Sequence, residues 1–180
     1  MNARPAKPII FYDFATTTGW CFGRPGDAPI YGAQRLAPPE SPPEAIFGGA
    51  IKLVAEHLKE HQPVIFCYEA PRDPRHMGKK TNIKTTLVTI GLCAVGSGVA
   101  SRMGVYDVRD VDANHVRQYF LGFKPAKDEV KAAVIRRCLD LGFKPDDDNA
   151  ADAIAGWHFM AAMIDPERMA YLTPYTKARR

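Results

Sequence analysis

The order of apolar segments along the chain predicts an α/β domain built on a mixed five-stranded sheet flanked by helices, with its first three strands antiparallel. The first observation is a set of three short apolar runs joined by tight polar turns between residues 9 and 36, which is typical of an antiparallel meander. The second is the alternation of helical and strand-like segments from 44 to 108. After residue 112 only helical patterns follow.

The predicted strands are short apolar runs bounded by turn residues, and they span residues 9–12, 20–22, 30–36, 64–68 and 105–108. The run at 64–68 is continuously apolar, as expected of a strand that is buried on both faces. Asp13 stands at the end of the first strand, and Glu69 directly follows the fourth. A charged residue in such a position lies at the rim of the sheet or is paired.

Helical spacing of apolar residues predicts helices over residues 44–61, 85–103, 112–120, 128–141 and 148–164. Ser41 is the predicted N-cap of the first helix, because Glu44 three residues later completes a capping box. His57 and His61 lie four residues apart, which is also the spacing of metal ligands, but the charged residues around them predict a solvated face. Asp112 or Asn114 caps the short helix, and Gly122 ends it.

The composition is that of one ordinary globular domain, predicted over residues 1–165 and followed by a basic tail at 166–180. The net charge of +4 permits an anionic partner without requiring one. We expect no membrane span, because the most apolar stretch, 85–100, is shorter than the roughly 20 residues that a span needs. Four cysteines without a C-x-x-C pair, Cys21, Cys67, Cys93 and Cys138, are predicted to be buried thiols of a cytoplasmic protein.

Acidic and small residues are concentrated at 146–155, where the last helix begins. Asp148 is the predicted N-cap, and Asp152 lies one turn further on the same helix face. The alanines that follow would let a second element approach closely. Acids at a helix start also complement the helix dipole, and that simpler interpretation remains open for this stretch taken alone.

Four carboxylates, on Asp13, Glu69, Asp148 and Asp152, would form a hard-oxygen site for two Mg²⁺ ions, with Mn²⁺ as a substitute. Two such ions can act on the attacking and leaving oxygens of a phosphodiester. The sequence has no serine or cysteine nucleophile motif, no phosphate-binding Gly-x-x-x-x-Gly-Lys and no dinucleotide fingerprint after its first strand. Metal-assisted hydrolysis without a small-molecule cofactor is the reaction class that remains.

Three motifs resemble those of the RuvC-type Holliday junction resolvases, in the same order along the chain. Residues 13–20, an acid followed by a Thr-Gly turn, resemble the first motif, and Tyr68-Glu69 resembles the second. Residues 149–155 resemble the Ala-Asp-Ala-Leu-Ala helix near the C-terminus, and 116–130 resembles the region that carries basic residues near the active site. The match spans residues 9–164 and is most similar to the phage and prophage branch.

The resemblance implies a ribonuclease H-like fold, a homodimer, two magnesium ions and paired nicking of four-way DNA. It implies that Asp13, Glu69 and Asp152 bind metal, and that Arg117 and Lys127 contact the scissile phosphate. Two positions depart from the family pattern. Asn149 replaces the usual acid or histidine, so we assign the fourth ligand to Asp148; Arg72 replaces an aromatic wedge, for which His76 or Met77 could substitute.

The predicted DNA-binding residues are the basic side chains around these motifs: Arg72, Arg75, Lys79, Lys80, Lys84, Arg117, Lys124 and Lys127. A solvated surface loop is the simpler alternative for the first five. The apolar helix at 85–103 is expected to pack against its counterpart in a homodimer. Two other functions remain open: a nuclease for RNA–DNA hybrids or branched replication DNA, and a DNA-binding module that Asn149 leaves catalytically weak.

Overall fold

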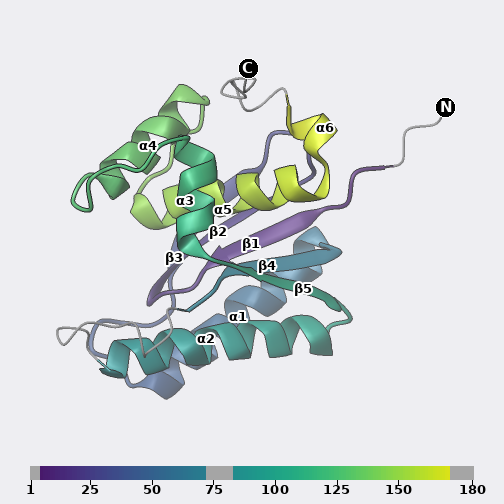
Figure 1. Ribbon diagram of the computed structural model, residues 1–180. Coiled ribbons are helices and arrows are strands. Elements are labelled where there is room, and N and C mark those ends of the chain that lie inside the picture. Colours follow the sequence, from purple (N-terminus) through teal and green to yellow (C-terminus); the bar gives the residue numbers. More distant parts are fainter. Residues whose placement is uncertain (1–4, 72–82, 171–180) are drawn as a thin grey trace.

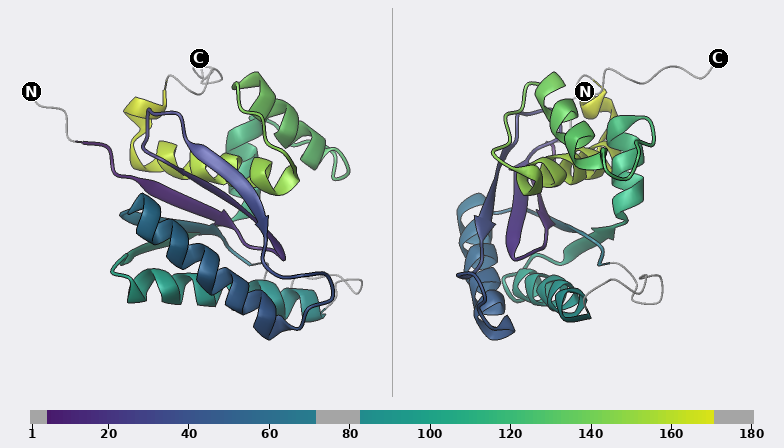
Figure 2. Two further views of the ribbon diagram at one scale, coloured as in Figure 1. Left: turned by 180° about the vertical axis from the view of Figure 1, so that it is seen from behind. Right: turned by 90° about the vertical axis from the view of Figure 1, so that its left-hand side faces the viewer.

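The computed structural model describes residues 5–71 and 83–170, which form a sheet with helices on both faces (Figure 1). The strands are β1 (Ile9–Asp13), β2 (Thr17–Gly23), β3 (Ile30–Arg35), β4 (Ile65–Glu69) and β5 (Asp107–Val111). The helices are α1 (Pro43–His61), α2 (Ile83–Arg102), α3 (Ala113–Leu121), α4 (Val130–Asp140), α5 (Asp148–Ile164) and α6 (Pro166–Met169). Helices α1 and α2 cover one face, and the other helices cover the opposite face (Figure 2).

The sheet has the order β3-β2-β1-β4-β5. Strands β1, β2 and β3 are antiparallel neighbours, whereas β4 pairs parallel with β1 and β5 pairs parallel with β4. The predicted mixed five-stranded sheet with three antiparallel strands first is therefore confirmed. Tyr12 pairs with Tyr68, so Asp13 and Glu69, each one residue further on, lie at the same edge of the sheet.

Two hydrophobic cores lie on the two faces of the sheet, because successive side chains of a strand point to opposite sides. Ile10 and Tyr12 of β1 belong to the core beneath α1 and α2. Ile9 and Phe11 belong to the core that α5 fills with Ile154, Trp157 and neighbouring small residues. Strand β1 is consequently buried on both faces and holds the two layers together.

Helix α5 approaches β1 and β2 more closely than an ordinary helix could. A Cβ atom on Gly19 would overlap the backbone carbonyl of Asn149, and one on Gly156 would overlap the ring of Phe11. Gly19 also pairs directly with Asp13 across the β1–β2 ladder. The two glycines thus bring the first turns of α5 against the strand that ends in Asp13, as the small residues of this stretch predicted.

Several predicted element boundaries differ from the structure. Strand β2, for example, already begins at Thr17 instead of residue 20, so Thr17 to Gly19 belong to the strand and not to the turn before it. Strand β5 begins at Asp107 instead of 105, because Gly104 turns the chain with a φ of 88° and the Val105 N–H still binds the Ala100 carbonyl at 2.9 Å. Helix α1 begins at Pro43 with Pro42 as its N-cap, and no side chain caps it. Ser41 is not the cap, because its own N–H donates to the Pro38 carbonyl at 3.3 Å within a preceding turn.

The predicted solvated face at the end of α1 is wrong for His57, which is only 9% exposed. Its Nδ1 lies 3.0 Å from the Tyr12 hydroxyl, and its ring centroid lies 4.4 Å from that of Trp20. Burial and the neighbouring His61 lower the pKa of His57 to about 4. His61 stacks on Phe22 with ring centroids 4.7 Å apart. Aromatic side chains on this face of the sheet therefore cover this end of the helix.

Beyond residue 165, the described part of the predicted basic tail is the short helix α6, and its Met169 is buried in the core. Residues 171–180 lie outside the described residues. The four cysteines are buried and unpaired, as predicted. One described helix, α2, is long and apolar enough to cross a membrane by length and composition alone, and it packs on α1.

The close contact between Gly19 and the Asn149 carbonyl leads to a testable prediction about stability. Gly19→Ala should lower the free energy of unfolding by about 3 kcal/mol, because the added methyl group meets backbone that cannot move without displacing α5. Gly48→Ala is the matched control: this exposed glycine of α1 has open space around it, and alanine should stabilise the helix by about 1 kcal/mol. Urea unfolding of the two variants measures both effects, and equal stabilities would show that α5 does not require a glycine here.

Candidate active site

Four acidic side chains come from three elements that meet at one edge of the sheet. Asp13 ends β1 and Glu69 ends the neighbouring parallel strand β4. Asp148 and Asp152 lie on the first turns of α5, which Gly19 allows to rest on the sheet beside Asp13. The Thr18 hydroxyl fixes the turn between β1 and β2 by donating to the Ala15 carbonyl at 2.7 Å. Residues far apart in the sequence are thereby placed side by side.

Burial and neighbouring negative charges raise the pKa values of two of these carboxylates, Asp13 and Asp152. Burial raises the pKa of Asp13 well above its usual value, and the negative charges of Glu69, Asp152 and Asp148 raise it further. The guanidinium of Arg117 acts in the opposite direction. The pKa of Asp152 is raised by its burial and by Asp148, and is lowered by Arg117 and Lys131. The site therefore holds more negative charge than its own side chains neutralise.

Asp148 is in direct contact with a cationic side chain. Its carboxylate accepts a hydrogen bond from the ammonium of Lys131 on α4, and this contact lowers its pKa. The predicted N-cap role of Asp148 is wrong by one residue. Asp147 is the cap, and its Oδ1 accepts from the Ala150 N–H at 2.8 Å.

The side-chain amide of Asn149 is also engaged within this turn. Its Nδ2 donates to Asp147 Oδ2 at 3.1 Å, so the cap residue holds the asparagine in place. Asp148 is left without a capping function. The arrangement favours Asp148 over Asn149 as a further carboxylate ligand, and that assignment stays a prediction.

Divalent cations suit the chemistry of this donor set, although the side chains do not converge as finished ligands. Within residues 5–71 and 83–170, no three Asp, Glu, His or Cys side chains are close enough together to hold a metal ion. Partly buried carboxylates that raise each other's pKa nevertheless gain from a cation placed between them. Mg²⁺ and Mn²⁺ prefer such oxygen donors, so the chemistry of the Asp13, Glu69 and Asp152 side chains suits these ions.

Cys93 of α2 lies beneath the acidic edge, which the sequence did not reveal. Its Sγ lies 3.8 Å from the Glu69 backbone carbonyl, to which it donates. Burial and the charges of Asp13 and Glu69 raise the pKa of Cys93 to about 12. The thiol is thus neutral and inert, and it links α2 to the end of β4. Only the helical spacing of α2 marked Cys93 as buried, and nothing in that spacing connected it with Glu69.

The predicted DNA-binding residues differ in their burial and in the elements on which they lie. Arg117 on α3 is half-buried and acts electrostatically on Asp13 and Asp152, whereas Lys124 and Lys127 are exposed in the loop between α3 and α4. Lys84 is exposed near the start of α2. Four others, Arg72, Arg75, Lys79 and Lys80, lie outside the described residues, as do His76 and Met77.

Lys131 is the site residue that the sequence interpretation missed. Its helical spacing, shared with Arg136 and Arg137, is compatible with a DNA contact or with a plain solvent face, yet it pairs with Asp148. Arg137 is buried, and its Nε donates to the Phe120 carbonyl of α3 at 3.3 Å. These contacts depend on how α4 packs against α5 and α3, which cannot be read from the spacing within α4.

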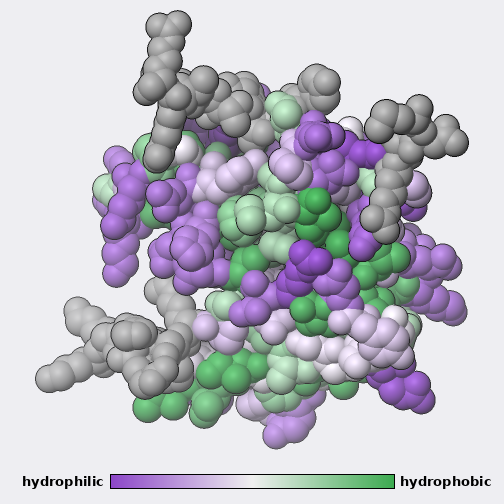
Figure 3. Space-filling view, turned by 45° about the vertical axis from the view of Figure 1, so that its right-hand side comes forward, coloured by the Kyte–Doolittle hydropathy of each residue, from purple (hydrophilic) through white to green (hydrophobic). Residues whose placement is uncertain are grey.

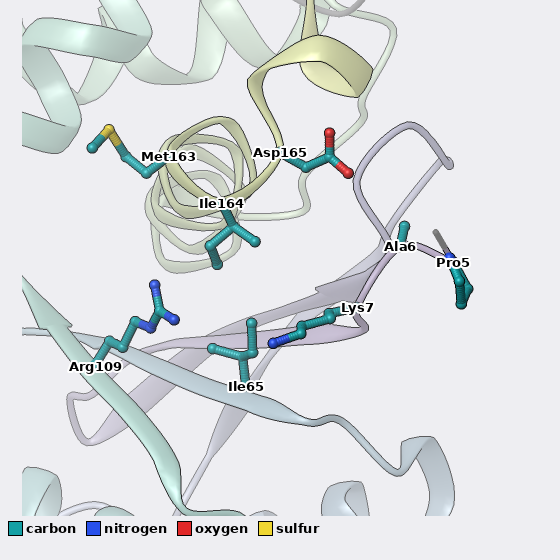
Figure 4. A pocket seen from close by; sticks show the side chains of 8 residues that line it. All are labelled: Pro5, Ala6, Lys7, Ile65, Arg109, Met163, Ile164 and Asp165. Atoms are coloured by element: carbon teal, nitrogen blue, oxygen red, sulfur yellow. The ribbon is translucent and has the colours of Figure 1, made fainter. Parts of the chain in front are cut away.

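A cavity of about 360 Å³ lies away from the carboxylates, beside the first residue of β4, Ile65 (Figure 4). Lys7 and Arg109 line it together with Ile164 and Asp165. Asp107 already holds the Arg109 guanidinium through contacts of 2.7 and 2.9 Å. Because Glu69 is at the opposite end of the same strand, this cavity is not part of the acidic site.

Solved structures similar to this chain include two of Thermus thermophilus RuvC. RuvC in complex with a Holliday junction substrate superposes with a TM-score of 0.66 at 20% identity, covering 91% of this chain and 96% of that one. A second RuvC structure gives a TM-score of 0.58 at 21% identity, covering 87% and 96%. The yeast mitochondrial Holliday junction resolvase Ydc2 gives 0.60 at 12% identity, covering 93% and 84%.

No model of a protein family matches the sequence, and neither does any curated protein. The similarity is therefore one of structure. It extends over most of this chain and of each neighbour. The chain has the ribonuclease H-like fold of the RuvC-type resolvases, as the motif resemblance implied.

Proposed function

We propose that this protein is a metal-dependent endonuclease that resolves four-way DNA junctions by paired nicks. The observation that carries the proposal is the group of repelling carboxylates at one sheet edge, on the fold of RuvC. A site that raises the pKa of its own acids is costly for folding, and such a cost is typical of functional sites. The junction substrate comes from the similarity to proteins that bind or resolve such junctions.

Asp13, Glu69 and Asp152 would hold the divalent ions, and Asp148 would complete the set. Two bound Mg²⁺ or Mn²⁺ ions would supply Lewis acidity to the attacking and leaving oxygens of the phosphodiester. Arg117 has the position of a phosphate-contacting residue, because its charge already acts on Asp13 and Asp152. Cys93 contacts the backbone carbonyl of Glu69, and Gly19 lets the start of α5 pack closely against β2.

Exposed lysines would contact the DNA backbone on either side of the site. Lys124 and Lys127 extend from the loop between α3 and α4, and Lys84 extends from the start of α2. We assign Arg72, Arg75, Lys79 and Lys80 the same role from their place in the sequence, directly after Glu69. Phosphate contacts of this kind position DNA without reading its sequence.

A second copy of the chain is the partner that α2 would bind. Ile83 and Leu87 are 75% and 62% exposed, and Ala94 and Gly98 continue the same exposed stripe. Figure 3 shows hydrophobic surface along the lower edge, where α2 lies in Figure 1. A dimer would bury this surface and supply two active sites for two nicks. The four buried, unpaired thiols are consistent with action in the reducing cytoplasm.

The metal ligands can be tested by replacing each carboxylate with its amide. Asp13→Asn, Glu69→Gln and Asp152→Asn should each reduce Mg²⁺-dependent nicking of a four-way junction about 100-fold or more. Junction binding in Ca²⁺ should persist. Retained nicking by Glu69→Gln would contradict the assignment, and a panel of forks, duplexes and RNA–DNA hybrids would identify another preferred substrate.

The same variants have a readout that does not depend on activity. The folded-state pKa of Asp13 is raised, so this carboxyl group lowers stability increasingly as the pH rises above its unfolded-state pKa, and to the full extent above its folded-state pKa. Asp13→Asn should therefore raise the melting temperature at neutral pH in the presence of a chelator. The gain should disappear at a pH below the unfolded-state pKa of aspartate, where the carboxyl group is neutral in both states.

The choice between Asp148 and Asn149 is also testable. Asp148→Ser should leave the helix cap intact, because Asp147 is the cap, and should strongly reduce nicking in Mg²⁺. Asn149→Ala removes only the amide that binds Asp147, and should leave nicking within about threefold of the unmodified protein. If Asp148→Ser cuts at the normal rate while Asn149→Ala does not, Asn149 is the ligand.

The dimer predicts a particular mass in solution. Light scattering at micromolar concentration should report close to twice 19.9 kDa. Leu87→Glu should yield a folded monomer, because the charge would be buried in the contact without a partner. Leu139→Glu is the control, since this α4 residue is 55% exposed and lies away from α2. A monomeric unmodified protein, both alone and with DNA, would refute the dimer.

A further inference from the structure

One ion pair joins two helices at the rim of the acidic site. The Lys131 ammonium on α4 donates to the carboxylate of Asp148 on the first turn of α5. The Lys131 side chain is 73% exposed, whereas that of Asp148 is 33% exposed. Most of the Lys131 side chain thus lies in solvent, and its ammonium group can be solvated by water if the ion pair with Asp148 breaks.

The charge of Lys131 acts on more than its direct partner. The pKa of Lys131 is raised first by its hydrogen bond to Asp148 and further by Asp152 and Asp13. Lys131 and Arg117 are the described cations whose charges lower the pKa values of Asp13, Asp148 or Asp152. Arg117 is half-buried on α3, so Lys131 is the more exposed and more easily displaced of the two.

The pair is not required to hold α4 against α5. Val134 and Cys138 of α4 are fully buried in the core shared by the two helices, and Cys138 Sγ donates to the Ala151 carbonyl at 3.8 Å. Exposed ion pairs of this kind contribute little to folding. A structural role therefore does not account for the position of Lys131 beside four carboxylates.

We propose that Lys131 is a built-in counter-ion that holds Asp148 until a divalent cation enters and then releases it, which lowers the affinity of the site for the cation. Two positive charges cannot share one carboxylate without repulsion, so cation binding must displace the ammonium. The released lysine lies at the rim, where it can contact a DNA phosphate. This positioning role rests on the proposed function, because it assumes a metal site at these carboxylates.

The test measures binding of Mn²⁺ alone, without DNA, by titration calorimetry. Lys131→Gln should bind Mn²⁺ about fivefold more tightly than the unmodified protein, because one opposing charge is gone and Asp148 is free. Lys131→Arg should restore the original affinity. Lys52→Gln is the matched control: it makes the same change on α1, where Lys52 pairs with Glu56 at 4.0 Å, and should leave affinity unchanged.

Two further measurements separate pairing with Asp148 from a general effect of charge. In an Asp148→Asn background, Lys131→Gln should tighten Mn²⁺ binding less than twofold, because the carboxylate that the lysine holds is absent. The fivefold difference should also shrink at 1 M salt, which screens exposed charges. A full fivefold effect in the Asp148→Asn background would overturn the pairing.

The outcomes distinguish this inference from the proposed function. Equal Mn²⁺ affinities of the unmodified protein and Lys131→Gln would overturn the counter-ion role and leave the metal site standing. Absence of Mn²⁺ binding in both proteins would overturn the metal site, and the counter-ion role with it. Equal melting temperatures of the two proteins in chelator would exclude a folding defect as the cause of an affinity change.

Discussion

The contact between the first turns of α5 and the β1–β2 hairpin is the constraint on which the rest of the site depends. Gly19 faces the Asn149 carbonyl and pairs with Asp13 across the ladder, so one missing side chain sets the distance between helix and strand. Asp148 and Asp152 are carried toward Asp13 by that approach. A longer separation would leave Asp148 and Asp152 apart from Asp13 and Glu69, and the charges of the two pairs would act on each other less.

The close approach of α5 to β1 brings negatively charged side chains near one another. The burial of apolar surface must offset their repulsion. The helix that carries Asp152 also carries Ile154, Trp157 and Met160, all buried on the same face of the sheet. Each large apolar side chain contributes about 1.5–3 kcal/mol when it is fully buried. Their burial acts against the repulsion that contributes to the raised pKa of Asp13. The helix therefore stays on the sheet even with its acidic end in an unfavourable position.

The features that the sequence predicted are those that depend on local pattern. Apolar runs located the strands and placed Asp13 and Glu69 at their ends, and motif order indicated the fold. The features that it missed depend on contacts across the fold. Charged neighbours in the sequence suggested that His57 is solvated, but Tyr12 and Trp20 cover it. Asp148 was the predicted cap of α5, whereas the backbone path makes Asp147 the cap.

The net charge of the proposed active site determines the order in which cations and a DNA phosphate can bind to it. With all four carboxylates ionised, Arg117 and Lys131 leave an excess of two negative charges. A DNA phosphate brought to the bare site would be repelled, whereas a divalent cation would be attracted. Cations must therefore enter before the phosphate or together with it. An ammonium that pairs with Asp148 until that moment neutralises part of the negative charge, and it becomes available to the DNA backbone when the cation takes its place.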